Sequence, residues 1–171
     1  MSKVKTNAMR ILDGKKISYQ LLTYEVDDCI DGVSVASKIQ RDVKEVFKTL
    51  VTRGSSKGIY VFVIPVAQEL DLKKAAKVVK EKKIEMISVN EINNLTGYIR
   101  GGCSPVGMKK LYPTIIDQSA LYLDTFIVSG GKIGLQIEIN PKELVKVIKP
   151  IFENITLSER SPDNDLDPNC A

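Results

Sequence analysis

The most informative feature of this sequence is the absence of histidine, which excludes several common kinds of active site. Without histidine the chain cannot build a Ser-His-Asp triad, a Cys-His pair or an HExxH metal site. It has three cysteines, and none are spaced as CxxC, so the usual spacing of a structural zinc site is also missing. Any chemistry must therefore rely on lysine, on carboxylates, on backbone N–H groups or on a reactive group of the substrate.

Long apolar runs are missing as well. Residues 1–7 are polar and lack the apolar stretch of a secretory signal, and no later run has the length needed to span a bilayer. We therefore expect a soluble, cytoplasmic protein. The 171 residues are 43% hydrophobic, which suffices for one contiguous core and predicts a single folded domain over residues 1–156.

Charge is distributed unevenly along the chain. Residues 157–171 hold four acidic residues against one arginine and have hardly any apolar content, so we expect a disordered acidic tail. Because the whole chain carries a net charge of +4, the remaining residues carry +7. A basic domain favours polyanionic partners such as nucleic acid, although charge alone fits many soluble proteins.

Apolar periodicity and turn residues predict helices and strands that alternate along the chain. Helices are expected near residues 4–12, 33–39, 71–79, 88–97, 119–123 and 140–149. Strands are expected at residues 17–24, 46–52, 59–66, 84–87, 114–116, 125–128 and 133–139. In the last strand, apolar residues alternate with Gly134, Gln136 and Glu138, which predicts one buried and one exposed face. Hairpins interleaved with helices indicate an α/β domain with a mixed sheet.

Lys48 lies in a predicted strand, on the face that also carries Val46 and Leu50. Two interpretations remain open from this spacing. In an edge strand, the lysine would extend its aliphatic stem to solvent. Alternatively, its ammonium would lie at the edge of an apolar pocket, where weak screening strengthens its attraction for a phosphate or a developing oxyanion.

Three glycines and a proline within residues 101–107 predict an irregular loop. Its backbone N–H groups could surround an anion or a carbonyl oxygen, although glycine-rich loops are common. Cys103 lies in this loop, but its thiolate would need an activator other than histidine, and we interpret it as a passive residue.

A further group of candidates consists of basic side chains that could contact nucleic-acid phosphates. They are Lys73, Lys77, Lys80, Arg100 and Lys109. The lysines follow one face of the helix predicted at residues 71–79, and a solvated helix face explains them equally well.

Several segments together resemble the YbaK/EbsC family of aminoacyl-tRNA deacylases, which are relatives of the editing domain inserted in some bacterial prolyl-tRNA synthetases. The matching segments are residues 46–50 (VFKTL), 70–74 (LDLKK), 96–98 (TGY), 101–107 (GGCSPVG), 113–117 (PTIID) and 128–135 (VSGGKIGL). They occur in the order of the family and cover the chain from about residue 3 to residue 152. Each segment alone is a weak match, whereas the six segments together are specific to this family.

The resemblance implies the fold of that family, a mixed and partly barrel-like sheet surrounded by helices. It implies that Lys48 is the essential lysine and that Tyr24, Thr49 and Ser129 line the pocket. It also implies that the loop surrounds the aminoacyl group through Gly101, Gly102, Ser104, Pro105 and Gly107. The resemblance implies neither a cofactor nor a metal. The basic side chains become candidates for contacts with tRNA.

The resemblance further implies a substrate and a partner. Family members hydrolyse Cys-tRNA(Pro), a mischarging product of prolyl-tRNA synthetase, and are thought to act together with that synthetase; Cys-tRNA(Cys) is a second expected substrate. In the mechanism proposed for the family, the thiol of the substrate attacks the ester, which suits a chain without histidine. Gln136 stands where the family often has an aspartate, and it could contact the substrate without charge. Two alternatives therefore stay open, a deacylase for another small amino acid, such as Ala-tRNA(Pro), and a non-catalytic module that binds tRNA or a synthetase.

Overall fold

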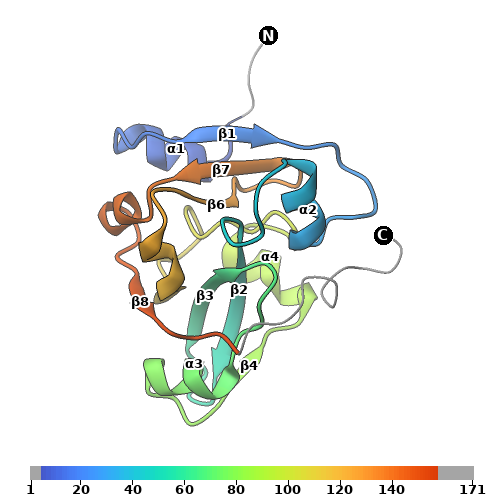
Figure 1. The fold of residues 1–171 in the computed structure, drawn as a ribbon. Helices are drawn as coiled ribbons and strands as arrows, with labels where there is room; N and C mark the ends of the chain where they lie inside the picture. The colour runs from blue at the N-terminus through green and yellow to red at the C-terminus, as the bar shows by residue number, and fades with distance from the viewer. Residues whose placement is uncertain (1–4, 158–171) are drawn as a thin grey trace.

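The computed structural model describes residues 5–157, in which helices and strands alternate along the chain (Figure 1). The helices are α1 (Asn7–Gly14), α2 (Gly32–Lys38), α3 (Leu72–Val79) and α4 (Val89–Thr96), with the 3-10 helices η1 (Gln118–Tyr122) and η2 (Pro141–Lys146). The strands are β1 (Gln20–Thr23), β2 (Phe47–Gly54), β3 (Ile59–Pro65), β4 (Ile84–Met86), β5 (Thr114–Asp117), β6 (Phe126–Ser129), β7 (Leu135–Ile139) and β8 (Ile151–Glu153). Within the described range, every helix is too short or too polar to cross a bilayer.

The strands form two sheets. The smaller sheet is antiparallel and has the order β1-β7-β6, in which Ser129 of β6 lies opposite Gln136 of β7. The larger sheet has the order β4-β2-β3-β5-β8. In it, β2 is antiparallel to β3 and β4, whereas β5 is parallel to β3 and β8. The expected α/β fold with mixed strand directions is therefore confirmed.

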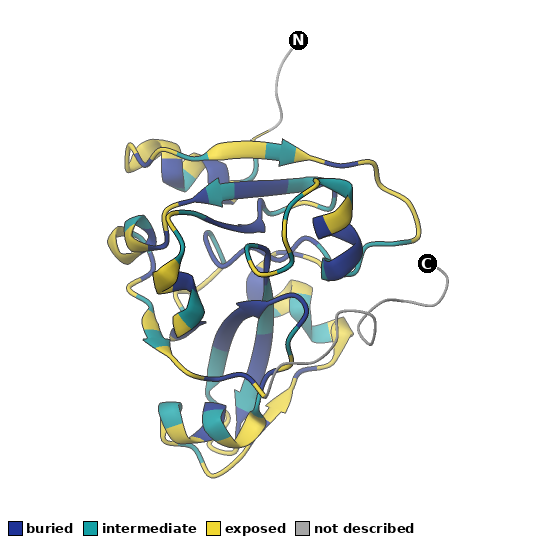
Figure 2. Cartoon of the chain, viewed as in Figure 1, coloured by how far each residue is buried: buried dark blue, intermediate teal, exposed yellow. Residues whose placement is uncertain are grey.

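The two sheets meet where β2 begins. Val46 forms a parallel bridge with Ile127 of β6, and the N–H of Ile127 donates to the carbonyl oxygen of Glu45 at 2.8 Å. Between the sheets, the rings of Phe47 and Phe126 pack edge to face with their centroids 5.1 Å apart. The inner strands are buried, whereas the exposed residues lie on the outer helices, on the connecting loops and on the outer strands β1 and β4 (Figure 2).

The helix boundaries follow the capping residues expected from the sequence. The side chain of Asp71 accepts hydrogen bonds from the N–H groups of Lys73 and Lys74, so that α3 begins directly after it. Ser88 and Glu91 form the predicted capping box of α4, and Gly97 ends that helix at φ 85°.

Three expectations from the sequence are wrong in detail. The helix predicted for residues 140–149 is the shorter 3-10 helix η2, and it is followed by β8, which no pattern indicated. Pro150 explains the early end, since a residue before proline is disfavoured in the helical conformation, and Lys149 has φ 49°. Strand β7 begins at Leu135 because Gly134, at φ 97°, breaks the extended backbone. Gln136 is not on an exposed face: it is only 6% exposed.

Most of the acidic tail predicted for residues 157–171 lies outside the described residues. Of this segment the structure describes Leu157, whose N–H donates to the carbonyl oxygen of Glu69 at 3.0 Å. The preceding residue, Thr156, forms an antiparallel bridge with Leu70.

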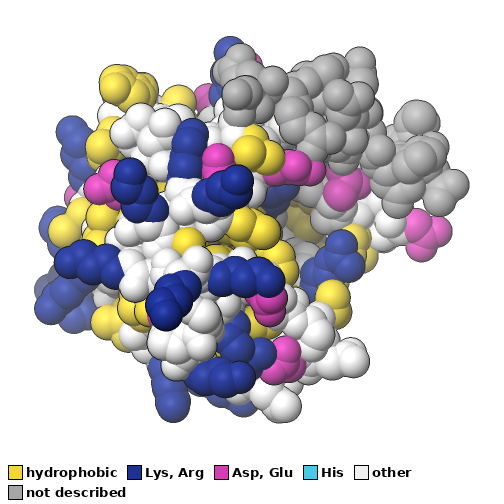
Figure 3. Space-filling view, turned by 90° about the horizontal axis from the view of Figure 1, so that it is seen from below, with side chains coloured by type: hydrophobic (Ala, Val, Ile, Leu, Met, Phe, Trp, Pro, Cys, Tyr) yellow, Lys and Arg dark blue, Asp and Glu magenta, His cyan; other side chains and the backbone are white. Residues whose placement is uncertain are grey.

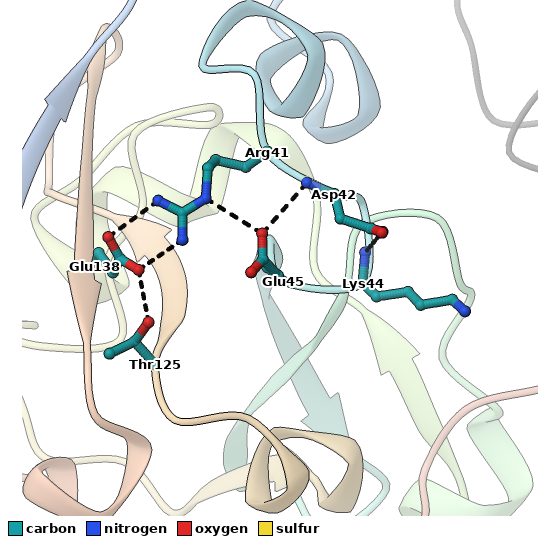
Figure 4. A network of polar contacts seen from close by, with 6 residues as sticks. All are labelled: Arg41, Asp42, Lys44, Glu45, Thr125 and Glu138. Atoms are coloured by element: carbon teal, nitrogen blue, oxygen red, sulfur yellow. Dashed lines mark hydrogen bonds and ion pairs between the residues drawn. The ribbon is translucent and has the colours of Figure 1, made fainter.

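A network of charged side chains fixes the segment that connects α2 to β2 (Figure 4). The guanidinium of Arg41 donates to both carboxylate oxygens of Glu138 on β7, at 3.0 and 2.6 Å, and to Glu45 at 3.2 Å. Thr125 donates a further hydrogen bond to Glu138 at 2.6 Å. Arg41 lowers the pKa of the Glu138 carboxyl group, as does the bond from Thr125. The network therefore ties the α2–β2 connection to the smaller sheet.

We expect Glu138→Gln to lower the free energy of unfolding by about 1–3 kcal/mol at neutral pH, because two charge-assisted hydrogen bonds are weakened in a largely buried setting. The folded-state pKa of Glu138 lies below its unfolded value of about 4.3. The stabilisation by the ionised Glu138 carboxylate is thus fully present above the unfolded-state pKa and is lost as the pH falls through the folded-state pKa. Urea unfolding between pH 3 and 7 measures the difference.

The matched control is Glu143→Gln, which removes an exposed ion pair with Lys146 within η2. It should change stability by less than about 0.5 kcal/mol. An equal loss in both variants, or a loss for Glu138→Gln that does not shrink at low pH, would contradict the structural role of the network.

Candidate active site

A cavity of about 580 Å³ lies between α2, the first half of β2 and the loop that follows α4. Another wall is formed by Ser129, the last residue of β6, and by Gln136, near the beginning of β7. Its lining is Ile30, Asp31, Gly32, Val33, Val35, Val46, Phe47, Lys48, Thr49, Leu50, Val66, Arg100, Gly101, Cys103, Ser129 and Gln136. The cavity therefore joins elements that are far apart in the sequence.

The pairing of β2 explains why this strand reaches the cavity. Strand β3 pairs with β2 along its whole length, whereas β4 pairs only with Thr52–Gly54. The first half of β2 consequently borders the cavity rather than a second strand. Lys48 lies opposite Ile64 of β3 and is half-buried in the cavity wall.

Three further side chains predicted for the site line the same cavity. The hydroxyl oxygen of Thr49 is buried and has no hydrogen-bond partner among the described residues. Ser129 and Gln136 are neighbours across the β6–β7 pair, and the hydroxyl of Ser129 accepts a hydrogen bond from the N–H of Gly131 at 3.2 Å. Because Gln136 faces the cavity, its burial is explained by the site and not by the core.

The loop of residues 101–107 divides between two cavities. Gly101 lines the larger one at φ 87°, and a Cβ there would lie 3.2 Å from Ile30. Gly102 packs on the backbone of Lys132 and Ile133 instead. Ser104 is fully buried, and its hydroxyl accepts a hydrogen bond from the N–H of Val106 at 3.2 Å. The remaining predicted loop residues, Pro105 and Gly107, line a second cavity of about 200 Å³.

Cys103 also lines the larger cavity, yet its environment does not favour a nucleophile. The side chain is 8% exposed, and burial raises the pKa of its thiol to about 11. A thiol with that pKa is almost entirely protonated at neutral pH, whereas the thiolate is the reactive form. The structure thus agrees with the passive role inferred from the sequence.

The other sequence candidates lie apart from the cavity lining, except for Arg100. Tyr24 is buried beside Lys38, whose ammonium lies 5.7 Å from the ring centroid, and the Tyr24 hydroxyl has no partner among the described residues. Lys73, Lys77 and Lys80 are exposed on α3 or at its end, and Lys109 is exposed beside Gly97. In the view from below, Lys and Arg side chains cover much of the surface (Figure 3).

Sequence reasoning missed the contribution of α2 and of the residues before it. Asp31, Gly32, Val33 and Val35 all line the cavity, together with Ile30. The available signal was an Asp-Gly pair directly before an apolar helix, which predicts a helix cap and gives no indication of a site. Among the described residues, no group of three or more Cys, Asp or Glu side chains could hold a metal ion.

Comparison with known proteins gives consistent matches. The aminoacyl-tRNA editing domain family matches residues 28–147. A protein of Enterococcus faecalis, named as a candidate Cys-tRNA(Pro)/Cys-tRNA(Cys) deacylase EbsC, is 44% identical over 158 residues, which cover 91% of this chain and 95% of that protein.

Two solved structures share the fold. One is described as a candidate trans-editing enzyme for prolyl-tRNA synthetase; its TM-score is 0.77 at 22% identity, covering 91% of this chain and 100% of that chain. The other, hypothetical protein APE2540, has a TM-score of 0.81 at 21% identity, covering 88% of this chain and 99% of that chain. At these identities the structural matches concern the fold alone.

The packing of Gly102 against the β6–β7 turn yields a stability prediction. A Cβ at this position would lie 2.8 Å from the backbone nitrogen of Ile133, so Gly102→Ala should lower the free energy of unfolding by about 1–3 kcal/mol. Gly14→Ala is the matched control, because a Cβ at Gly14 would meet nothing within 4 Å. Thermal unfolding of both variants tests this; equal melting temperatures would show that the loop does not pack on the turn.

Proposed function

The chain belongs to the aminoacyl-tRNA editing domain family, and on this premise we propose that it is an aminoacyl-tRNA deacylase acting on Cys-tRNA(Pro) and Cys-tRNA(Cys). The 44% identity with the Enterococcus faecalis protein extends over nearly the whole of both chains, which supports a shared substrate class. In this proposal residues 1–156 form the deacylase domain, which acts in the cytoplasm on mischarged tRNA(Pro) together with a prolyl-tRNA synthetase.

The observation that carries the proposal is the position of Lys48 in the wall of a 580 Å³ cavity. Attack on an aminoacyl ester places negative charge on the carbonyl oxygen, and a fixed cation in a partly desolvated wall stabilises that charge. Thr49 and Gly101 border the same space, and the buried hydroxyl of Thr49 is available to a ligand. Lys48 is the catalytic residue in this proposal.

The attacking group comes from the substrate. The thiol sulfur of the cysteinyl group bonds to the ester carbonyl carbon, the C–O bond to the ribose breaks, and the thiol proton passes to the departing ribose oxygen. The cysteinyl group thus leaves the tRNA as a cyclic thioester, and water then opens that ring to give free cysteine. The protein contributes orientation and charge stabilisation. Two features support this assignment: the chain has no histidine, and the pKa of Cys103, at about 11, leaves its thiol protonated.

The body of the tRNA has its own contacts in this proposal. Arg100 stands in the cavity wall and is exposed, so it can bind a phosphate next to the aminoacylated end. The exposed lysines of α3, with Lys109, offer further contacts to phosphates at a distance from the cavity.

Lys48→Ala tests the site directly. The change should lower the single-turnover rate on Cys-tRNA(Pro) by about 100-fold or more, since it removes the cation expected to stabilise the developing oxyanion. Lys48→Arg should also be slow, because a planar guanidinium does not replace a compact ammonium. Melting temperatures of both variants should stay near that of the wild type.

The matched control is Lys44→Ala, since Lys44 is exposed and does not line the cavity. This variant should deacylate at the wild-type rate. If Lys48→Ala is folded and also retains the wild-type rate, the cavity is not the active site.

A further inference from the structure

The cavity contains one carboxylate among its lining residues, that of Asp31. Two cationic side chains, Lys48 and Arg100, line the same space. An aminoacyl-tRNA carries charges of both signs near its ester, because the phosphates are anionic and the free α-amino group is protonated to a large extent near neutral pH. The positive charges of Lys48 and Arg100 match the anionic parts, and Asp31 is the described lining residue whose negative charge matches the ammonium.

The two oxygens of Asp31 have different environments. Oδ2 accepts a hydrogen bond from the N–H of Ser34 at 3.0 Å and so caps α2. Oδ1 is buried and has no hydrogen-bond partner within residues 5–157. Burying a carboxylate oxygen without a donor is unfavourable, and natural proteins seldom leave such a group unpaired without a functional reason.

Close packing holds Asp31 in place. A Cβ at the next residue, Gly32, would lie 2.3 Å from a methyl carbon of Val66, so the start of α2 lies directly against the end of β3. Behind it, Val33 and Ala36 are buried against Val46, the residue that joins the two sheets. The segment that carries Asp31 is therefore packed against the start of the strand that carries Lys48.

We propose that Asp31 binds the α-ammonium of the aminoacyl group and thereby selects aminoacyl-tRNA with a free amino group. This assignment rests on the deacylase function proposed above. The χ2 torsion of an aspartate is broad, so a small turn about the Cβ–Cγ bond brings Oδ1 toward the cavity while Oδ2 keeps the cap of α2. An N-acylated aminoacyl-tRNA has no ammonium to offer and would leave the carboxylate unpaired, so the site rejects it.

The test measures binding of a stable analogue in which cysteine is joined to 3′-amino-3′-deoxyadenosine by an amide, with its amino group either free or acetylated. Wild-type protein should bind the free-amine analogue roughly 10- to 100-fold more tightly than the acetylated one, as expected for a charge-assisted hydrogen bond. Asp31→Asn should lose most of this preference and bind both analogues as weakly as the wild type binds the acetylated one. Asparagine is as good a helix cap as aspartate, so α2 should remain folded.

The matched control is Asp71→Asn, which makes the same change at the cap of α3, outside the cavity lining. It should keep the full preference for the free amine. The proposal is overturned if the wild type binds both analogues equally, if Asp31→Asn keeps the wild-type preference, or if Asp31→Asn weakens binding of both analogues by the same factor.

Hydrolysis of Cys-tRNA(Pro) by the wild type, measured in parallel, separates the two proposals. A preference for the free amine without any hydrolysis would leave Asp31 as an ammonium site and remove the deacylase function. Hydrolysis that proceeds without that preference would leave the deacylase function and remove the role of Asp31.

Discussion

The join between the two sheets at the start of β2 is the constraint on which the site depends. Val46, directly before β2, forms an isolated bridge with Ile127 of the smaller sheet, and from Phe47 onward β2 pairs with β3. Next to this bridge the edge of β2 borders the cavity, because β4 pairs only with Thr52–Gly54, and Lys48 and Thr49 lie at that edge. The Arg41–Glu138 pair holds the preceding segment against β7, so the crossing point is fixed by hydrogen bonds and by charge.

The same join determines which chemistry the cavity can support. It brings fixed charges and backbone groups to one space, while the chain has no histidine to act as a general base and the Cys103 thiol is protonated. A site of this kind can orient a substrate and stabilise charge as it develops. It therefore suits a substrate that carries its own nucleophile, as a cysteinyl ester does.

The sequence predicted local structure well because caps and turns depend on a few neighbouring residues. Asp71, the Ser88–Glu91 pair and Gly97 mark helix ends in the structure as they did in the pattern. It could not predict β8, whose pairing with β5 depends on a contact between distant segments. Gln136 was assigned to an exposed face because alternation distinguishes two faces of a strand and cannot tell solvent from a cavity. Asp31 was missed for a similar reason, since its local role as a cap conceals its place in the cavity.

Whether the substrate supplies the nucleophile can be decided by single-turnover deacylation of tRNA(Pro) charged with cysteine, serine or alanine. We expect rapid release of cysteine and rates lower by a factor of at least about 100 for serine and alanine, because a hydroxyl is a far weaker nucleophile than a thiol and a methyl group is none. Release of alanine as fast as cysteine would contradict attack by the substrate thiol, because water would then have to attack the ester directly.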